Sequence, residues 1–147
     1  MNIDIRTVST TDHAAWLPLW QGYLDFYQSA VPAETGEVTW QRFLDPNEPM
    51  HAALAWRDGR AVGLVHFIYH RSCWTEGDYC YLQDLFVAAV RRGEGIGRQL
   101  IEHVYTQARF AGASRVHWLT HESNRDAMHL YDRIADRSGF VQYRQIL

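Results

Sequence analysis

The stretch from residue 79 to residue 102 constrains the fold of this chain more than any other part of the sequence. Residues 79–87 (YCYLQDLFV) are mostly aromatic or branched, which is typical of a strand covered on both faces. Further on, apolar residues recur every three or four positions, which predicts an amphipathic helix over 97–111. Between these two patterns lie three alternating glycines: Gly93, Gly95 and Gly97. The sequence therefore predicts a strand, a tight turn and a helix in direct succession.

This glycine turn is predicted to bind an anion. Glycine lets the backbone bend sharply with its N–H groups exposed, and these amides open a helix whose N-terminal dipole favours negative charge. Arg91 and Arg92 stand beside it. A Walker motif is excluded because Gly97 is followed by Arg98 and Gln99, and the glycine spacing does not match the dinucleotide pattern G-x-G-x-x-G. The expected ligand is a phosphate or a diphosphate.

Two motifs resemble those of the GCN5-related N-acetyltransferase (GNAT) family. Arg92-Gly93-Glu94-Gly95-Ile96-Gly97 resembles its Arg/Gln-x-x-Gly-x-Gly/Ala loop, which binds the diphosphate of acetyl-CoA. Asn124-x-x-Ala127-x-x-Leu130-Tyr131, followed by Gly139-Phe140, is similar to an element whose Asn contacts the pantetheine arm and whose Tyr protonates the departing sulfur. The resemblance covers most of 78–143, although the link 132–138 is longer than usual. It implies that Tyr131 is the general acid and that acetyl-CoA is bound by Leu85, Phe86, Val87, Arg92, Gly93, Glu94, Gly95, Ile96, Gly97, Arg98, Asn124, Ala127 and Tyr131.

The order of the predicted elements also resembles that of the GNAT family. The patterns predict strands at 2–8, 52–56, 61–71, 79–87, 115–120 and 139–147, and helices after 12 and at 39–44, 97–111 and 124–135. We expect an α/β (α+β) GNAT fold, with a central mixed, mostly antiparallel sheet of about six to seven strands flanked by about four helices. No linker or repeat interrupts the chain, so residues 1–147 are expected to form a single N-acetyltransferase domain.

Composition argues against several other classes. Hydrophobic residues make up 47% of the chain and charged residues 21%, a globular balance. The net charge of -3 offers no general basic surface for nucleic acid, and no apolar run reaches membrane-spanning length. We therefore expect a cytoplasmic protein with no nucleic-acid or membrane partner. Cys73 and Cys80 are expected to be free thiols, and no metal site is predicted.

The resemblance implies direct transfer of an acetyl group from acetyl-CoA to a primary amine of a small molecule or peptide. The oxyanion needs a backbone N–H, and the strand that precedes the glycine turn ends at Phe86-Val87, with amides free to supply one. The alternative is a CoA- or acyl-CoA-binding regulatory module without transferase activity, but the Asn124/Tyr131 element favours the enzyme. The many aromatic residues and the expected closing strand are compatible with a homodimer.

The sequence leaves the general base open. YLQDLFV resembles YLEDFFV of the diamine (spermidine/spermine-type) acetyltransferases, in which the glutamate is the proposed base, but Gln83 occupies that position and cannot accept a proton. Asp84 is expected to face the other way, because side chains alternate along a strand. Glu34, Glu37, His66, His121 or a water relay are the other candidates. A substrate that enters deprotonated, or one whose amine has a low pKa, would also satisfy the chemistry.

An acceptor pocket is expected to include Tyr27, Glu34 and Gln83. Aromatic rings with carboxylates in the segment 23–40 would suit a cationic amine, and a solvated acidic loop is the alternative interpretation.

Overall fold

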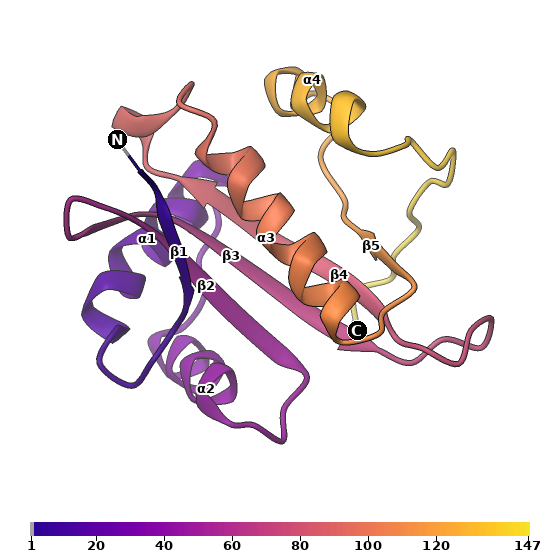
Figure 1. Ribbon diagram of the computed structural model, residues 1–147, viewed down its shortest axis with the longest axis horizontal. Coiled ribbons are helices and arrows are strands. Elements are labelled where there is room, and N and C mark those ends of the chain that lie inside the picture. Colours follow the sequence, from indigo (N-terminus) through magenta and orange to yellow (C-terminus); the bar gives the residue numbers. More distant parts are fainter. Residues whose placement is uncertain (1) are drawn as a thin grey trace.

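Five strands form one sheet in the order β1-β2-β3-β4-β5 in the computed structural model, which describes residues 2–147 (Figure 1). Strands β1 to β4 pair antiparallel, and β5 pairs parallel with β4. The elements in chain order are β1 Asp4–Thr7, α1 His13–Phe26, α2 Ala33–Leu44, β2 Met50–Arg57, β3 Arg60–His70, β4 Tyr79–Val87, the 3-10 turn Ala89–Arg91, α3 Ile96–Phe110, β5 Arg115–His117 and α4 Arg125–Ile134. The predicted mixed, mostly antiparallel sheet with four α-helices is confirmed, with a lower strand count than the six to seven expected.

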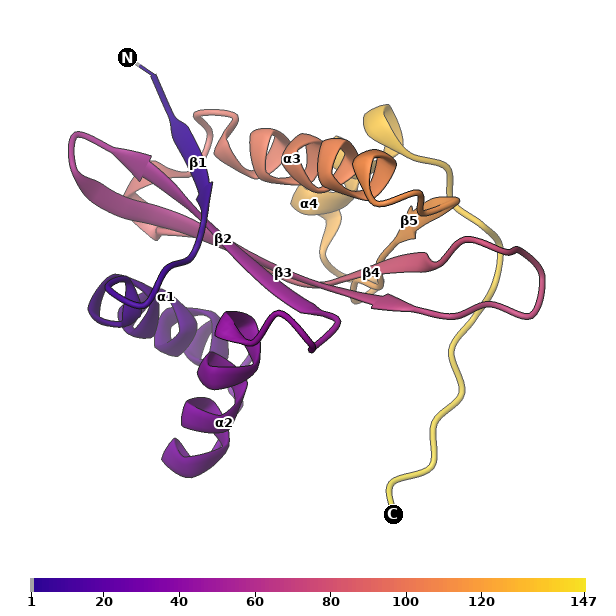
Figure 2. The same ribbon diagram turned by 60° about the horizontal axis from the view of Figure 1, so that its bottom comes forward.

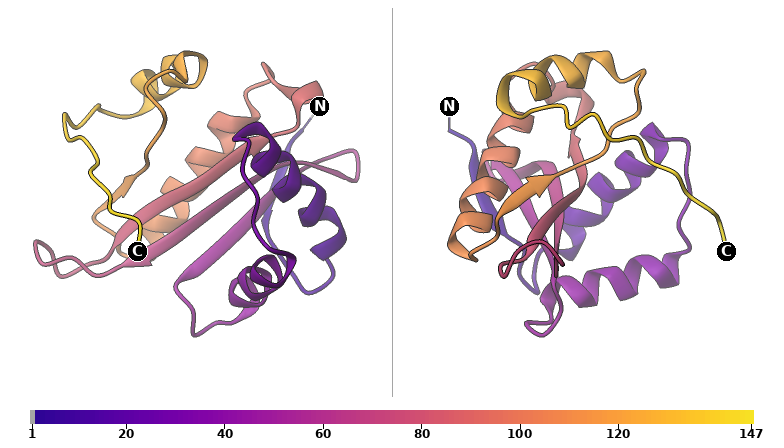
Figure 3. Two further views of the ribbon diagram at one scale, coloured as in Figure 1. Left: turned by 180° about the vertical axis from the view of Figure 1, so that it is seen from behind. Right: turned by 90° about the vertical axis from the view of Figure 1, so that its right-hand side faces the viewer.

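Helices cover both faces of the sheet (Figure 2). One face packs against α3, and its core consists of Ala53, Ala55, Val62, Val65, Phe67, Cys80, Leu82, Ile96, Leu100, Ile101, Val104 and Ala108. The other face packs against α1 and α2, and its core consists of Val8, Trp16, Leu19, Trp40, Phe43, Ala52, Leu54 and Leu64. Figure 3, seen from behind, shows α1 and α2 on the second of these faces. The apolar alternation of β2 and β3 therefore fills two separate cores.

The closing strand predicted at 139–147 is absent. Residues 135–147 form no regular structure, and their apolar side chains are exposed: Phe140, Val141, Tyr143, Ile146 and Leu147. This tail runs out from the end of α4 and away from the sheet (Figure 2). An alternating pattern needs a neighbouring edge strand to pair with, and here the tail pairs with none of the described strands.

Other elements differ from the prediction mainly in length. Helix α2 begins at Ala33, six residues before the predicted start at Thr39, because Pro32 precedes its first turn and Gly36 is accommodated inside the helix. Strand β5 is shorter than predicted and ends at His117. None of the helices within residues 2–147 is long and apolar enough to span a membrane.

Strands β4 and β5 stay together for only three residue pairs. The pairing runs from Tyr79/Arg115 to Tyr81/His117, and beyond it the segments that follow the two strands diverge (Figure 1). Apart from Gln83, residues 82–87 therefore pair with β3 on one side, and none of them has a strand partner on the other. This open edge of β4 leads directly to the glycine turn.

Candidate active site

The glycine turn has the geometry of an anion-binding loop. Gly93 and Gly95 have positive φ angles of 83° and 80°, a conformation that favours glycine, and Gly95 is the N-cap of α3. Among the hydrogen bonds of residues 2–147, none uses the amides from Gly93 to Arg98 as donors. A Cβ atom added at Gly93 or Gly95 would meet no heavy atom within 4 Å. The loop thus presents a row of free amides to open space at a helix N-terminus.

The charged side chains of this loop are already engaged with the protein. Glu94 Oε1 accepts a hydrogen bond from Arg57 Nη1 at 2.7 Å. Arg92 Nε donates to the carbonyl oxygen of Val87 at 3.2 Å, and its guanidinium lies over the rings of Phe26 and Phe86. Arg98 pairs with Glu102 along the helix. The side chain of Glu94 therefore faces the Arg57 guanidinium. The groups of the loop that are left to contact an anion are mainly its backbone amides.

The hydrogen-bond ladder decides which β4 amides face the open edge. The amide of Ala88 donates to the carbonyl of Val62 on the β3 side. Backbone groups alternate along a strand, so the amides of Leu85 and Val87 point to the open edge and that of Phe86 points to β3. Of the two residues expected to offer a free amide to the oxyanion, Val87 is thus a suitable donor and Phe86 is not.

A β-bulge lies at the position of the expected base. His66 pairs with Asp84 and Phe67 with Leu82, so Gln83 is an extra residue without a partner on β3. The bulge resets the alternation, and Asp84 lies on the α1 face, where it contacts His66. Gln83 itself is exposed. The regular alternation that placed Asp84 opposite Gln83 in the sequence argument is therefore interrupted at this position.

Asp84 is the centre of a buried polar group on the α1 side. Its Oδ2 lies 2.8 Å from His66 Nδ1, and the exposed fractions of the two side chains are 12% and 2%. Trp16 Nε1 donates to His66 Nε2 at 3.0 Å. Burial, together with the nearby Asp84 charge, raises the pKa values of three surrounding phenols: Tyr23, Tyr27 and Tyr81. The sequence singled out Tyr27 as a pocket residue and His66 as a candidate base. It did not predict that both lie next to the Asp84 carboxylate.

Helix α4 brings Tyr131 to the same region. Burial, with a smaller effect of Tyr27, raises the pKa of the Tyr131 phenol to about 12. The ring of Tyr131 packs edge-on against that of Trp118, and a Cβ added at Gly97 would touch Leu130. These contacts dock α4 beside the N-terminus of α3.

The second predicted motif, which begins at Asn124, lies at the start of α4. Asn124, the N-cap of α4, donates from Nδ2 to Thr120 Oγ1 at 3.0 Å, which leaves its carbonyl oxygen available as an acceptor. Ala127 is half-buried one turn further on, and Ile96 is buried under the loop. The structure thus brings the end of β4, the glycine turn and the first turn of α4 to one side of the sheet.

The remaining base candidates lie elsewhere. Glu34 is exposed in the first turn of α2 and enters none of the hydrogen bonds or ion pairs of the described residues. Glu37 pairs with His13 and Gln41. His121 is exposed and bonded to Ser123. Of the predicted pocket residues, the structure therefore joins only Tyr27 to the centre formed by Asp84.

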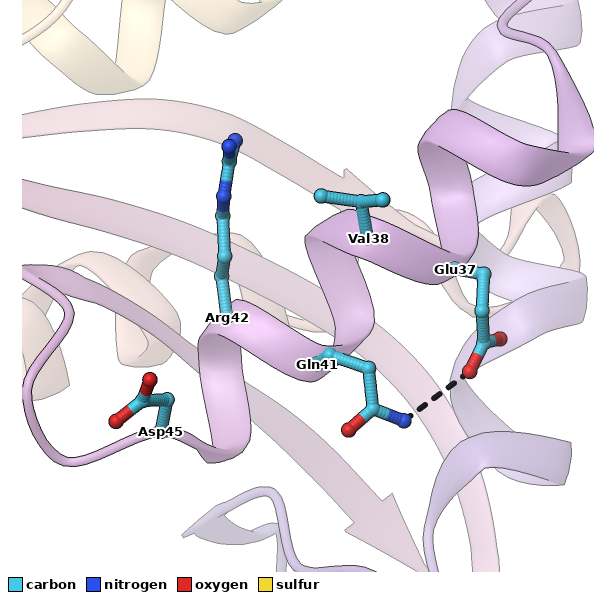
Figure 4. Close-up of a pocket in the computed structure, with 5 residues that line it drawn as sticks. All are labelled: Glu37, Val38, Gln41, Arg42 and Asp45. Atoms are coloured by element: carbon cyan, nitrogen blue, oxygen red, sulfur yellow. Dashed lines mark hydrogen bonds between the residues drawn. The ribbon is translucent and has the colours of Figure 1, made fainter.

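Two shallow surface depressions do not belong to this centre. One lies on the outer side of α2, where Gln41 and Glu37 are hydrogen-bonded (Figure 4). The other lies between α1 and the β2–β3 turn, with Pro18, Trp56 and Arg60 among its lining residues. Neither contains Asp84 or Tyr131. Within residues 2–147, no three His, Cys, Asp or Glu side chains are grouped to hold a metal ion.

Comparison with known proteins identifies the class to which this loop and fold belong. The profile of the Acetyltransferase (GNAT) family matches residues 16–135. The chain is 34% identical over 145 residues to the D-amino-acid N-acetyltransferase HPA3 of Saccharomyces cerevisiae, which covers 97% of this chain and 90% of that protein. It is 28% identical over 133 residues to the thialysine N-epsilon-acetyltransferase of Caenorhabditis elegans, with 90% and 82% covered. The structure of AAC(6')-Iy with the bisubstrate analog CoA-S-monomethyl-acetylneamine superposes with a TM-score of 0.86 at 17% identity, covering 100% and 99% of the two chains.

The chain belongs to the GNAT family. It is an acetyl-CoA-dependent N-acetyltransferase that acts on amines, and the alternative of a regulatory module without transferase activity is overturned by its named relatives. The described residues fit the cofactor: a row of unpaired amides meets open space beside the N-terminus of α3, and the open edge of β4 adjoins it. Acetyl-CoA supplies the acetyl group as a thioester.

Proposed function

We propose that residues 1–147 act as one N-acetyltransferase domain that acetylates a primary amine of a small molecule or peptide by direct transfer. The observation that carries this assignment is the row of free amides from Gly93 to Arg98, which meets open space at the N-terminus of α3. The open edge of β4 leads to this row, and Leu130 of α4 lies beside Gly97. A loop suited to the acetyl donor and the helix that carries Tyr131 thus lie side by side.

Within this proposal, the backbone of the loop holds the diphosphate. The residues that bind acetyl-CoA are the amides of Gly93 to Arg98, the β4 edge at Leu85 and Val87, and the first turn of α4 at Asn124 and Ala127. The amide of Val87 stabilises negative charge on the reacting carbonyl oxygen. The side chain of Glu94 is not a ligand in this assignment, because it pairs with Arg57.

Tyr131 is the proposed general acid. Burial raises its pKa to about 12. The phenol therefore keeps its proton at neutral pH and can donate it to the departing thiolate. Tyr27, 43% exposed, is proposed as a wall of the acceptor pocket. Glu34 and Gln83 were expected beside it, and their exposed positions support at most an outer rim.

Substitution of Tyr131 tests the role. Tyr131→Phe is expected to lower kcat by about 100-fold, the usual weight of a general acid, with the Kd of acetyl-CoA unchanged by calorimetry. Tyr143→Phe, in the exposed tail, is the matched control and keeps wild-type kcat. An unchanged kcat in Tyr131→Phe removes this residue from the mechanism.

The acceptor is found by thiol release on a panel of amines. The panel contains D-amino acids, thialysine and aminoalkylphosphonates, the groups named for relatives of this chain, together with polyamines and a peptide. The sequence contains no lysine, so acetylation of the enzyme's own lysines cannot contribute to the signal. Tight binding of acetyl-CoA without turnover on any member contradicts the acceptor class proposed here.

We also propose a cytoplasmic homodimer. The exposed thiol of Cys73 suits a reducing compartment. The apolar tail 139–147 keeps a strand-like alternation, and β5 is an edge strand in the described sheet, so the tail of one copy can pair with the β5 edge of a second. Light scattering is expected to give a dimer for the full chain and a monomer after truncation at Ser138. A monomeric full chain contradicts the dimer.

A further inference from the structure

The group formed by Trp16, His66 and Asp84 has no role in the assignments above. It joins α1, β3 and β4 through two hydrogen bonds, of 3.0 Å between Trp16 and His66 and 2.8 Å between His66 and Asp84. The side chains of Trp16 and His66 are buried, whereas Asp84 keeps an exposed fraction of 12%. The group therefore opens outward only at its carboxylate.

The chemistry of indole fixes the tautomer of His66. The Nε1–H of Trp16 can only donate, so His66 Nε2 must accept and carries no proton. A neutral imidazole then has its single proton on Nδ1, where it donates to Asp84 Oδ2. In this arrangement His66 is not a free base, since its only lone pair in the ring plane is already used. It holds and orients the carboxylate.

The charge of Asp84 has no cationic partner in the described chain. Among residues 2–147 no arginine forms an ion pair with it, and the groups that face it are His66 and the phenols of Tyr23, Tyr27 and Tyr81. A mostly buried carboxylate without a counter-charge is costly, and a ligand cation relieves that cost. Aromatic faces around it also favour an ammonium group.

We propose that Asp84 is the catalytic carboxylate that binds the acceptor's ammonium group and takes its proton. His66 is a positioning residue for Asp84, and Trp16 fixes the tautomer of His66. The inference rests on the proposed N-acetyltransfer and supplies the base that Gln83 cannot be. It also defines the acceptor as an amine that enters the site as a cation, with its charged end toward the Tyr23, Tyr27 and Tyr81 phenols.

The protons balance in this scheme. The ammonium gives one proton to Asp84, and the freed nitrogen lone pair forms the C–N bond as the C–S bond of the thioester breaks. Tyr131 gives its proton to the sulfur, so that CoA leaves as a thiol. The nitrogen gives up a second proton, which restores Tyr131. Asp84 releases the first proton to solvent, and one proton is produced per turnover.

Replacement of the carboxylate tests the proposal. Asp84→Asn is expected to lower kcat/KM for the amine by about 100-fold or more, with the Kd of acetyl-CoA unchanged. Asp45→Asn, the same change at an exposed carboxylate that follows α2, is the matched control and stays within about twofold of wild type. Wild-type kcat/KM in Asp84→Asn overturns the inference. Wild-type enzyme that binds acetyl-CoA but acetylates no amine instead overturns the proposed function.

The tautomer of His66 is a readout independent of turnover. Nitrogen-15 NMR of the wild-type protein is expected to show the His66 proton on Nδ1, and Trp16→Phe is expected to lose that single form. His66→Gln can still accept from Trp16 and donate to Asp84, so it should keep kcat/KM within about tenfold, whereas His66→Leu should resemble Asp84→Asn. A proton on Nε2 of His66 in the wild-type protein contradicts the positioning role. Wild-type kcat/KM in both the His66→Gln and the His66→Leu variants contradicts it as well.

Discussion

Arg57 and Glu94, 37 positions apart in the sequence, are joined by a 2.7 Å ion pair between Nη1 and Oε1. The pair links the end of β2 to the loop that precedes α3. Arg91 also approaches Glu94, at 4.0 Å. Since Glu94 lies within the loop that we propose binds the diphosphate, its carboxylate needs these cations to keep it from opposing the ligand.

Arg57→Gln is therefore expected to weaken acetyl-CoA binding by about three- to tenfold, because the Glu94 charge is left less neutralised beside the diphosphate. The double variant Arg57→Gln/Glu94→Gln should recover most of the lost affinity, which calorimetry on all four members of the cycle measures. Additive losses in the double variant would show that Arg57 acts on the ligand without Glu94.

Gly95→Ala should affect both stability and binding. A left-handed alanine costs about 1–2 kcal/mol of the free energy of unfolding, and relaxation of that strain turns the amides away from the ligand, with a loss of at least about tenfold in acetyl-CoA affinity. Gly112, at the opposite end of α3, also has a positive φ of 78° and open space around it.

Gly112→Ala is the matched control for Gly95→Ala. It is expected to lose a similar amount of stability in urea unfolding and to bind acetyl-CoA like wild type. Equal affinity losses in the two variants would indicate a general effect of strain and count against the loop assigned to the diphosphate.

Gly22 tests the packing of α1 on β4. A Cβ at this position would lie 2.9 Å from two atoms of the Phe86 ring, so Gly22→Ala should lower the free energy of unfolding by about 1–3 kcal/mol. Gly36→Ala, in α2, places its Cβ 3.9 Å from Trp20 Nε1, an ordinary contact, and should stabilise the protein by up to about 1 kcal/mol. Urea midpoints in the opposite order would contradict this view of the interface.

Stability should fall in mild acid. Burial lowers the pKa values of His51, His103 and His117 below their ordinary value of 6.5, with additional effects of Arg115 and His70 on His117. The unfolded chain then binds more protons than the folded chain as the pH drops below 6.5, so the free energy of unfolding decreases there. Urea unfolding at pH 7.5 and 5.5 measures the difference, which His103→Gln should reduce. Identical midpoints at the two pH values would refute it.

Local patterns predicted much of this molecule because their physical causes are local. The glycine turn needs residues that tolerate positive φ and a helix that follows, and both are readable from Gly93 and Gly95. The same holds for β2 and β3, predicted as strands at 52–56 and 61–71, and for the amphipathic helix α3. These elements appear where they were expected.

The face on which Asp84 lies is not a local property. It depends on the bulge at Gln83, which arises from the pairing of β4 with β3, a partner in another part of the chain. The tail 139–147 shows the converse: its alternation is that of a strand, yet it pairs with none of the described strands, although β5 is an edge of the sheet. Residues whose roles depend on distant partners, such as His66, could therefore be placed only by the fold.

The complete burial of Trp16 couples acceptor chemistry to folding. Because Trp16 packs with Trp40 and Phe43 under the sheet and also donates to His66, few changes at Trp16 or His66 could alter the reaction without also loosening the α1–α2 core. The more exposed phenols, above all that of Tyr27, are not part of this core and can change without loosening it. Enzymes with this arrangement should therefore change their choice of amine by substitutions at exposed residues such as Tyr27 and should retain the buried Trp16 and His66.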